Sequence, residues 1–231
     1  MNGFDFTLCG AALTALPSGA LWWAAARMLI VTDLHLGRSE RYARRGGALL
    51  PPYETRDTLA RLDADMQATG AATILCLGDS FDDSAAAGAL DESDLMWLTR
   101  LMAGRRWLWV EGNHDPGPLA LGGTHLAQHR AGPLTFRHIA EPGAVGEVSG
   151  HYHPKATLSA RGQRLTRPCF LIDADRTILP AYGTYTGGMS CTDPLLRGLM
   201  RPAARAVLLG LPPRPVPFSG TAGQRPTTAS I

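Results

Sequence analysis

Four short polar clusters constrain this 231-residue chain more than any other feature of its sequence. Three apolar runs, at residues 28–31, 73–77 and 107–110, are bounded by Gly and Asp and are typical of buried strands in an α/β sheet. Because ligands bind where such strands end, the polar side chains that follow them should meet in one crevice. The clusters are Asp33-Leu34-His35, Gly78-Asp79 with Asp82, Gly112-Asn113-His114-Asp115 and Gly150-His151-Tyr152-His153.

Asp, His and Asn together are the ligands of a borderline divalent metal. Taken singly, each cluster has an ordinary structural explanation: a strand-end turn for Asp33-Leu34-His35, a helix N-cap for Asp79, or packing for a buried histidine. The combination outweighs these explanations, since four of the seven histidines fall in the clusters. One Asp-x-His pair, one His-x-His pair and a bridging Asp suffice for two ions, so the pattern predicts a dinuclear metal phosphoesterase.

Composition excludes little. Hydrophobic and charged contents of 45% and 18% are ordinary for a soluble globular protein, and a net charge of +2 is too small to indicate nucleic acid by itself. The four cysteines show no Cys-x-x-Cys spacing, and Cys76 and Cys169 lie in apolar runs, which favours buried free thiols in a reducing compartment.

The uncharged stretch 6–26 resembles a membrane or signal segment at first sight. Gly10, Pro17 and Gly19 interrupt it and Asp5 precedes it, so the prediction is two short strands joined at residues 17–19. With no targeting segment recognised, a cytoplasmic location is expected.

Along the chain we expect a long arginine-rich loop over residues 37–52, a helix over 54–69 and a second helix over about 91–103. The half that follows residue 122 is rich in short β-like runs, at 134–136, 145–148, 169–172 and 178–180. An α/β half facing a β-rich half predicts a two-sheet sandwich flanked by helices. We expect one domain over 1–218 and a disordered tail over 219–231.

The order of the motifs, D-x-H, G-D-x-x-D, G-N-H-D, a lone His and then G-H-x-H, resembles the calcineurin-like metallophosphoesterases. That resemblance implies a four-layer αββα sandwich, of mixed α/β or α+β class, and metal-dependent phosphodiester hydrolysis. Residues 33–37, 150–156, 179–183 and 186–188 resemble, more narrowly, the bacterial DNA-ligase-associated metallophosphoesterases. This family implies a DNA-repair nuclease with DNA as its partner, encoded beside a ligase and a helicase. The resemblance covers about residues 6–218.

The resemblance also implies the ligands of each ion. Ion one takes Asp33, His35, Asp79 and His153, and ion two takes Asp79, Asn113, His151 and one further histidine. For that ligand we choose His138, which closes the strand expected at 134–136, over His129 and His125. Mn²⁺ is the expected metal, with Zn²⁺, Fe²⁺, Co²⁺ and Ni²⁺ as alternatives.

His114 is the expected general acid, with Asp82 holding its other ring nitrogen. In the arginine-rich loop, Arg38 is nearest the metals and is expected to contact a substrate phosphate, whereas Arg41, Arg44 and Arg45 could equally be solvated.

The favoured function is an endonuclease acting on single-stranded or structured DNA. A small-molecule phosphodiesterase or phosphatase is the alternative, and a non-catalytic binding scaffold ranks below it. Enzymes that cleave the pyrophosphate of a lipid A precursor share the fold but generally carry Arg where this chain has His114.

Overall fold

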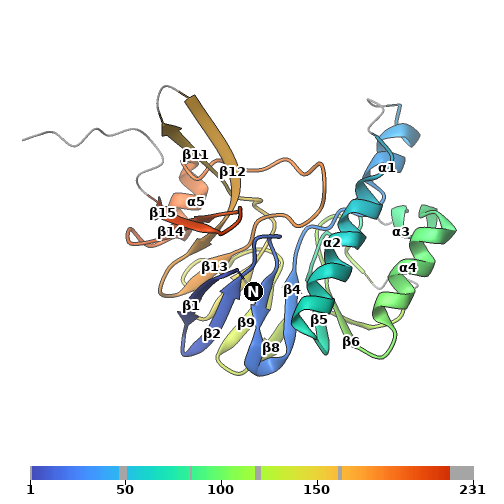
Figure 1. Ribbon diagram of the computed structural model, residues 1–231, viewed down its shortest axis with the longest axis horizontal. Coiled ribbons are helices and arrows are strands. Elements are labelled where there is room, and N and C mark those ends of the chain that lie inside the picture. The colour runs from blue at the N-terminus through green and yellow to red at the C-terminus, as the bar shows by residue number, and fades with distance from the viewer. Residues whose placement is uncertain (1, 47–50, 84, 118–120, 161–162, 219–231) are drawn as a thin grey trace, which may run out of the picture.

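Two β-sheets packed face to face form the centre of the molecule (Figure 1). The computed structural model describes residues 2–46, 51–83, 85–117, 121–160 and 163–218. The first sheet has the order β1-β2-β3-β4-β5-β6-β7, antiparallel up to β4 and parallel from β4 to β7. Its strands are Phe4–Leu8, Ala11–Ala15, Leu21–Trp23, Met28–Val31, Thr73–Leu77, Arg106–Val110 and Thr124–Leu126.

The second sheet has the order β15-β14-β12-β13-β10-β9-β8, with β11 paired to β12. Strands β9, β10 and β13 run parallel, and the other pairs are antiparallel. From β8 to β15 the strands are His129–Ala131, Leu134–Arg137, Glu147–Ser149, Lys155–Ala160, Gln163–Ile172, Arg176–Ile178, Arg205–Leu208 and Arg214–Pro217.

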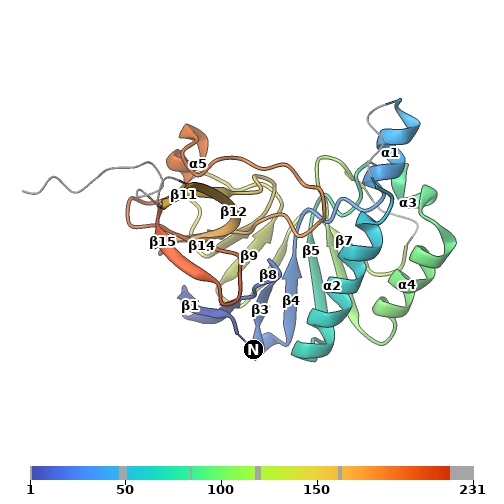
Figure 2. The same cartoon turned by 45° about the horizontal axis from the view of Figure 1, so that its top comes forward.

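Helices lie on the outer faces of the two sheets (Figure 2). Leu59, Leu62 and Met66 of α2 and Leu98 of α4 pack on the first sheet, while α5 packs on the second beside Leu171. A continuous apolar layer separates the two sheets. The helices are α1 (Arg38–Arg44), α2 (Glu54–Thr69), α3 (Ala86–Ala89), α4 (Glu92–Met102) and α5 (Pro194–Leu199), with a 3₁₀ turn at Ala24–Ala26. The predicted αββα sandwich is therefore confirmed, although α5 makes its fourth layer thin.

The apolar periodicity placed both long helices correctly. The helix expected over 54–69 is α2, which ends at Gly70 in the left-handed conformation, and the helix expected over 91–103 is α4. The stretch 6–26 contains parts of three strands rather than two. Among the described residues, no helix is both long and apolar enough to cross a membrane.

The prediction of a loop over residues 37–52 was wrong for its first half, where α1 forms. The segment consists of Arg, Ser, Glu, Tyr and Ala, residue types that are compatible with a helix. Glu40 forms an ion pair with Arg44 one turn later, and Glu54 accepts a hydrogen bond from the Ser39 amide (2.9 Å). Residues 47–50, and the tail expected over 219–231, lie outside the described residues. Cys76 and Cys169 are buried free thiols, as predicted.

Candidate metal centre

The candidate ligands follow the carboxyl ends of parallel strands in both sheets. From the first sheet, Asp33 follows β4, Asp79 follows β5 and Asn113 follows β6. From the second, His138 directly follows β9 and His151 follows β10. Because the two sheets face each other, these ends meet at one edge of the sandwich. The crevice expected from the strand ends is thus built by both sheets, not by the first alone.

The ligand loops are held in an unfavourable backbone conformation. Eight described non-glycine residues have positive φ, and five of them are Asp33, His35, Asp79, His151 and His153, with φ from 45° to 71°. A left-handed residue costs roughly 1–2 kcal/mol, so such a cluster indicates a functional constraint. The Asp-x-His and His-x-His pairs therefore do not lie on extended strands: β4 ends at Val31 and β10 at Ser149, before the ligands begin.

The first cluster contains Asp33, His35 and His153, whose ligand atoms lie within 4.8 Å of one another. Asp33 Oδ1 lies 3.1 Å from His153 Nε2, while Oδ2 accepts hydrogen bonds from Thr32 Oγ1 (2.7 Å) and the His151 amide (2.9 Å). Burial raises the pKa of Asp33, but the hydrogen bond and charge of His153 outweigh it and the pKa is lowered overall. Asp33 is therefore anionic, with one oxygen turned toward the histidines.

The second cluster contains Asp79, His138 and His151. His138 Nδ1 donates to the carbonyl oxygen of Leu77 (2.8 Å), so Nε2 is the nitrogen left for a ligand. That nitrogen lies 3.0 Å from Asn113 Oδ1, 3.2 Å from His151 Nδ1 and 3.4 Å from Asp79 Oδ2. Four electron-pair donors thus point at a common space.

The charges of this second cluster are strongly coupled. Burial raises the pKa of Asp79, yet the hydrogen bond and charge of His138 hold it at about 2. Burial lowers the pKa of His138, but Asp79 and Asp33 raise it to about 9. His151, by contrast, has a lowered pKa because of burial and the charge on His138. Without a metal, a proton on His138 holds this cluster together.

Both clusters fit divalent ions. His35 is 2% exposed and its Nε2 has no hydrogen-bond partner in the structure. His138 Nε2 can offer a hydrogen bond to only one of the three acceptor atoms that face it, whereas a cation satisfies all of them. Imidazole, carboxylate and amide ligands suit a transition ion better than Mg²⁺. Asp33, His35 and His153 would hold one ion, and Asp79, Asn113, His138 and His151 would hold the other.

The alternatives to His138 lie elsewhere. His125 stacks on Trp109 and His129 stacks on Phe136, and neither belongs to a cluster of ligand atoms among the described residues. The structure thus brings together the seven residues that the resemblance implied.

Asp82 is placed differently from its predicted position. His114 Nδ1 donates to the backbone carbonyl oxygen of Asp82 (2.8 Å), not to its carboxylate. The carboxylate lies 3.0 Å from His35 Nδ1 and accepts a hydrogen bond from Arg41 Nη1 (2.7 Å). Asp82 therefore holds His114 through its main chain and orients His35 through its side chain, an arrangement typical of metal-bound histidine.

Arg38 lies at the same carboxylate, with Nε 3.7 Å from Asp82 Oδ1. Its Nη1 is buried and has no hydrogen-bond partner among the described residues. Of the four arginines considered in the sequence, Arg38 and Arg41 contact the centre through Asp82, and Arg44 and Arg45 pair with Asp83 instead.

Asp115 is a supporting residue to which the sequence analysis gave no role. Its buried carboxylate accepts hydrogen bonds from the amides of Asp79 (2.9 Å), Ser80 (2.8 Å) and Gly112 (3.1 Å). A side chain at Gly112 would collide with the Asp79 backbone, so only glycine allows the two loops to approach this closely. The signal was present in the sequence, since Asp115 closes the Gly112-Asn113-His114-Asp115 motif.

A cavity of about 400 Å³ lies next to Asn113 and His138. Glu111, Gln128, Arg137 and Ile139 are among its other lining residues. The centre therefore has open space beside it on the β6–β9 side.

The sandwich and its paired clusters of Asp, His and Asn define a metal-dependent phosphoester hydrolase. The family model for calcineurin-like phosphoesterases matches residues 26–170, and the chain belongs to this family. Over 92% of this chain and 100% of the other, the structure is similar to the crystal structure of Pseudomonas putida nuclease MPE, with a TM-score of 0.72 and 30% sequence identity. No curated protein matches the chain.

Proposed function

We propose that this phosphoesterase is an endonuclease that hydrolyses phosphodiester bonds of single-stranded or structured DNA in repair. The observation that carries the proposal is the pair of ligand clusters, Asp33 with His35 and His153 and Asp79 with His138 and His151, combined with the likeness to a bacterial nuclease over nearly the whole chain. DNA is the proposed substrate and partner. A DNA ligase and a helicase encoded alongside are proposed partners in the same repair process, and the cytoplasm is the proposed location.

Mn²⁺ is the proposed native metal, with Zn²⁺, Fe²⁺, Co²⁺ and Ni²⁺ as alternatives. Two such ions would supply Lewis acidity toward the phosphate oxygens and would make a water molecule more acidic. Asp33, His35 and His153 would hold one ion, and the set built around His138 the other. Asp79 contacts His138 and is the proposed ligand shared by both ions.

His114 is the proposed general acid. Its side chain is 32% exposed, and Nε2 lies 3.9 Å from Asp79 Oδ2, at the edge of the ligand set. The Asp82 carbonyl fixes Nδ1 as the other protonated nitrogen, so Nε2 faces the centre and can deliver a proton to the oxygen of the leaving group. The ring is tethered at one nitrogen and accessible at the other, as this step requires.

Arg38 is the proposed phosphate contact. The guanidinium lies beside the Asp82–His35 pair, and Nη1 has no partner. A phosphate oxygen would satisfy that donor and add charge stabilisation. Arg38→Ala should therefore raise KM for DNA with little change in metal content.

A small-molecule phosphodiesterase is the second candidate. The cavity of about 400 Å³ beside Asn113 and His138 falls within the size range of small-ligand sites, which favours this alternative.

One assay separates the two candidates. The protein loaded with Mn²⁺, Mg²⁺, Zn²⁺ or Ni²⁺ is given circular single-stranded DNA, cyclic nucleotides and bis-p-nitrophenyl phosphate in parallel. Linearisation of the circle with Mn²⁺ supports the endonuclease, because an exonuclease has no end to attack. An intact circle together with rapid cyclic-nucleotide hydrolysis would favour the small-molecule enzyme.

A further inference from the structure

Apart from Arg38, the arginines in and directly after α1 already pair with carboxylates. Arg41 Nη1 lies 2.7 Å from Asp82 Oδ2, Arg44 Nη2 lies 3.1 Å from Asp83 Oδ1, and Arg45 Nη2 lies 3.5 Å from Asp83 Oδ2. A polyanion would have to displace these pairs before it could use the arginines. Beyond the single contact proposed for Arg38, helix α1 is therefore a weak surface for binding a phosphate backbone.

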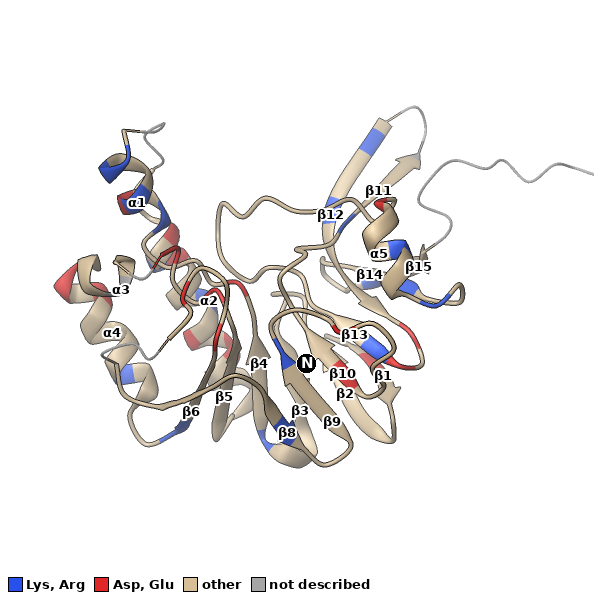
Figure 3. Cartoon of the chain, turned by 180° about the vertical axis from the view of Figure 1, so that it is seen from behind, with Lys and Arg blue, Asp and Glu red and all other residues tan. Residues whose placement is uncertain are grey.

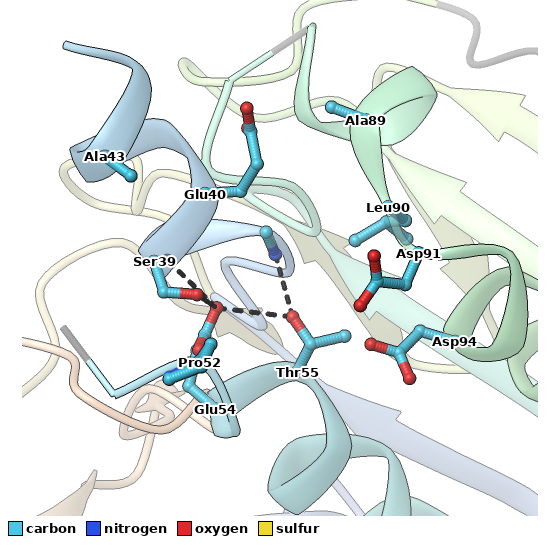
Figure 4. Close-up of a pocket in the computed structure, with 11 residues that line it drawn as sticks. Ser39, Glu40, Ala43, Pro52, Glu54, Thr55, Ala89, Leu90, Asp91 and Asp94 are labelled. Atoms are coloured by element: carbon cyan, nitrogen blue, oxygen red, sulfur yellow. Dashed lines mark hydrogen bonds between the residues drawn. The ribbon is translucent and has the colours of Figure 1, made fainter. Parts of the chain in front are cut away.

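An acidic cavity lies on the same side of the molecule as α1. It measures about 430 Å³, and its lining includes Glu40, Glu54, Asp91 and Asp94 (Figure 4). Glu54 Oε1 accepts hydrogen bonds from the Ser39 amide and hydroxyl, and Glu54 is 2% exposed. Glu40 and Asp94 pair with Arg44 and Arg56, but Glu54 and Asp91 pair with no cation among the described residues. Their charge repels phosphates, so a nucleic acid strand should leave the centre in another direction.

The hairpin β11–β12 projects on the opposite side (Figures 1 and 2). It begins at Lys155, two residues after His153. Residues 163–168 of β12 pair with β11, whereas residues 169–172 enter the eight-stranded sheet. Six residues of strand give the ribbon a length of about 20 Å, enough to lie along several phosphates of one strand.

The ribbon is basic. Residues 154–172 contain no Asp or Glu. Arg164 and Arg167 are exposed, and neither guanidinium has a carboxylate or hydrogen-bond partner among the residues that the structure describes. Figure 3 shows the cations on β12 away from the acidic segments beside α1 and α4. These two guanidinium groups are therefore available to an external anion.

The two faces of the ribbon differ. Ala156 and Leu158 lie on the face that packs toward α5, and Arg167, opposite Ala156, shares that face. Arg164 lies on the other face, opposite Ser159. Because side chains alternate along a strand, Lys155, Thr157 and Thr166 share the face of Arg164, and the two threonine hydroxyls hydrogen-bond each other (2.8 Å).

The face of Arg164 is also the face connected to the metal loops. Lys155 Nζ donates to the carbonyl oxygen of Thr186 (3.1 Å). The segment that contains Thr186 reaches the centre at both ends: the Gly183 amide donates to the Asp33 carbonyl (3.0 Å), and the Met189 amide donates to the His153 carbonyl (3.2 Å). A strand held on this face would continue directly toward the ligands.

We propose that the face of the β11–β12 hairpin formed by Lys155, Thr157, Arg164 and Thr166 binds the sugar–phosphate backbone of single-stranded DNA beside the scissile phosphate. This inference rests on the proposed nuclease function and names the surface that holds its substrate. Arg164 pairs with a phosphate, and the threonine hydroxyls bond phosphate or sugar oxygens. Such contacts are independent of sequence, and their strength falls with added salt.

The test compares Arg164→Glu with Arg167→Glu, a matched change of charge on the same strand but on the opposite face. The Mn²⁺-loaded proteins are assayed for kcat/KM on a single-stranded oligonucleotide at several salt concentrations. We expect Arg164→Glu to lower kcat/KM about tenfold at low salt and to flatten the salt dependence by about 0.7 in the log–log slope, the contribution of one phosphate contact on a single strand. Arg167→Glu should lower kcat/KM less than about threefold, because it changes only the long-range electrostatic potential around the hairpin.

Metal content and hydrolysis of bis-p-nitrophenyl phosphate report whether each variant is folded with an intact centre, and Arg164→Lys should restore most of the DNA activity. Equal losses from the Arg164 and Arg167 variants, or no loss from either, would overturn the role of this face while leaving the nuclease function standing. A parent protein that hydrolyses the small ester but leaves DNA intact would overturn the proposed function, and the hairpin's role with it.

Discussion

At the scale of single residues, the centre concentrates strain and charge that the rest of the fold avoids. Five ligand candidates have left-handed backbones, and Asp33, His35 and His138 are almost wholly buried. Such residues destabilise a protein unless a ligand compensates them. Asp79 contacts His138 and His114, and it is the ligand that both proposed ions would share.

Asp79→Asn should abolish turnover and lower the occupancy of both ions, because a charge between two cations is lost. Asp33→Ala should mainly empty the site that contains His35 and His153. Metal analysis of the purified variants, alongside an activity assay, checks this. Two full equivalents of metal and near-parental activity in Asp79→Asn would contradict the bridging role.

His114→Ala should keep its metals but lose about 10²–10⁴-fold in rate on DNA, the range typical of a general acid. The loss should be smaller on bis-p-nitrophenyl phosphate, since p-nitrophenolate leaves without a proton. Rates on both substrates, measured with metal content, test this. An equal loss on both would indicate that His114 positions the substrate instead.

At the scale of secondary-structure elements, the sequence correctly predicted the helices and loops that local residue patterns determine. Apolar periodicity located α2 and α4, and the polar clusters located the loops that carry the ligands. Contacts between distant segments could not be read in the same way. The carboxylate of Asp82 orients His35 because α1 brings Arg41 to its other oxygen, and α1 itself was expected to be a loop. Left-handed ligand residues were also missed, since non-glycine residues rarely adopt that conformation.

Asp115 joins the loops after β5 and β6, and Asp115→Ala should loosen both. Four amides, those of Asp79, Ser80, Phe81 and Gly112, would lose their buried acceptor, so we expect the protein to be destabilised by at least about 2 kcal/mol. For a chain of this size that corresponds to a fall in Tm of roughly 4–8 °C. Thermal unfolding measures it. Asp193→Ala is the control. The Asp193 carboxylate accepts an amide hydrogen bond at the exposed start of α5, so its removal should lower the free energy of unfolding by less. Similar losses in the two variants would argue against the joining role.

At the scale of the whole molecule, the ligands come from both sheets. Asp33, His35, Asp79 and Asn113 belong to the first sheet's loops, and His138, His151 and His153 to the second's. Bound ions would therefore cross-link the sandwich at one edge, in addition to the apolar layer that already joins the sheets. Folding and metal binding should be thermodynamically coupled.

Removing the metals should lower the stability of the whole sandwich rather than of one loop. An ion present at 100 times its Kd stabilises the folded state by about 2.7 kcal/mol, which corresponds to a Tm difference of roughly 5–11 °C. Calorimetry of chelator-treated and Mn²⁺-loaded protein measures this difference. A single transition that shifts as a unit is expected, and an unchanged Tm would contradict the cross-link.

The metal-free protein should also respond to pH through His138. Its pKa is raised to about 9 by Asp79 and Asp33, so its charge contributes stability that is fully present below the unfolded value of about 6.5 and is lost as pH rises through about 9. The Tm of chelated protein should therefore fall over that window, in which the carboxylates stay ionised. Mn²⁺-loaded protein should show no such fall, because its ligand histidine is already unprotonated. A metal-free His138→Gln variant that declined with pH as steeply as the parent would assign the effect to another group.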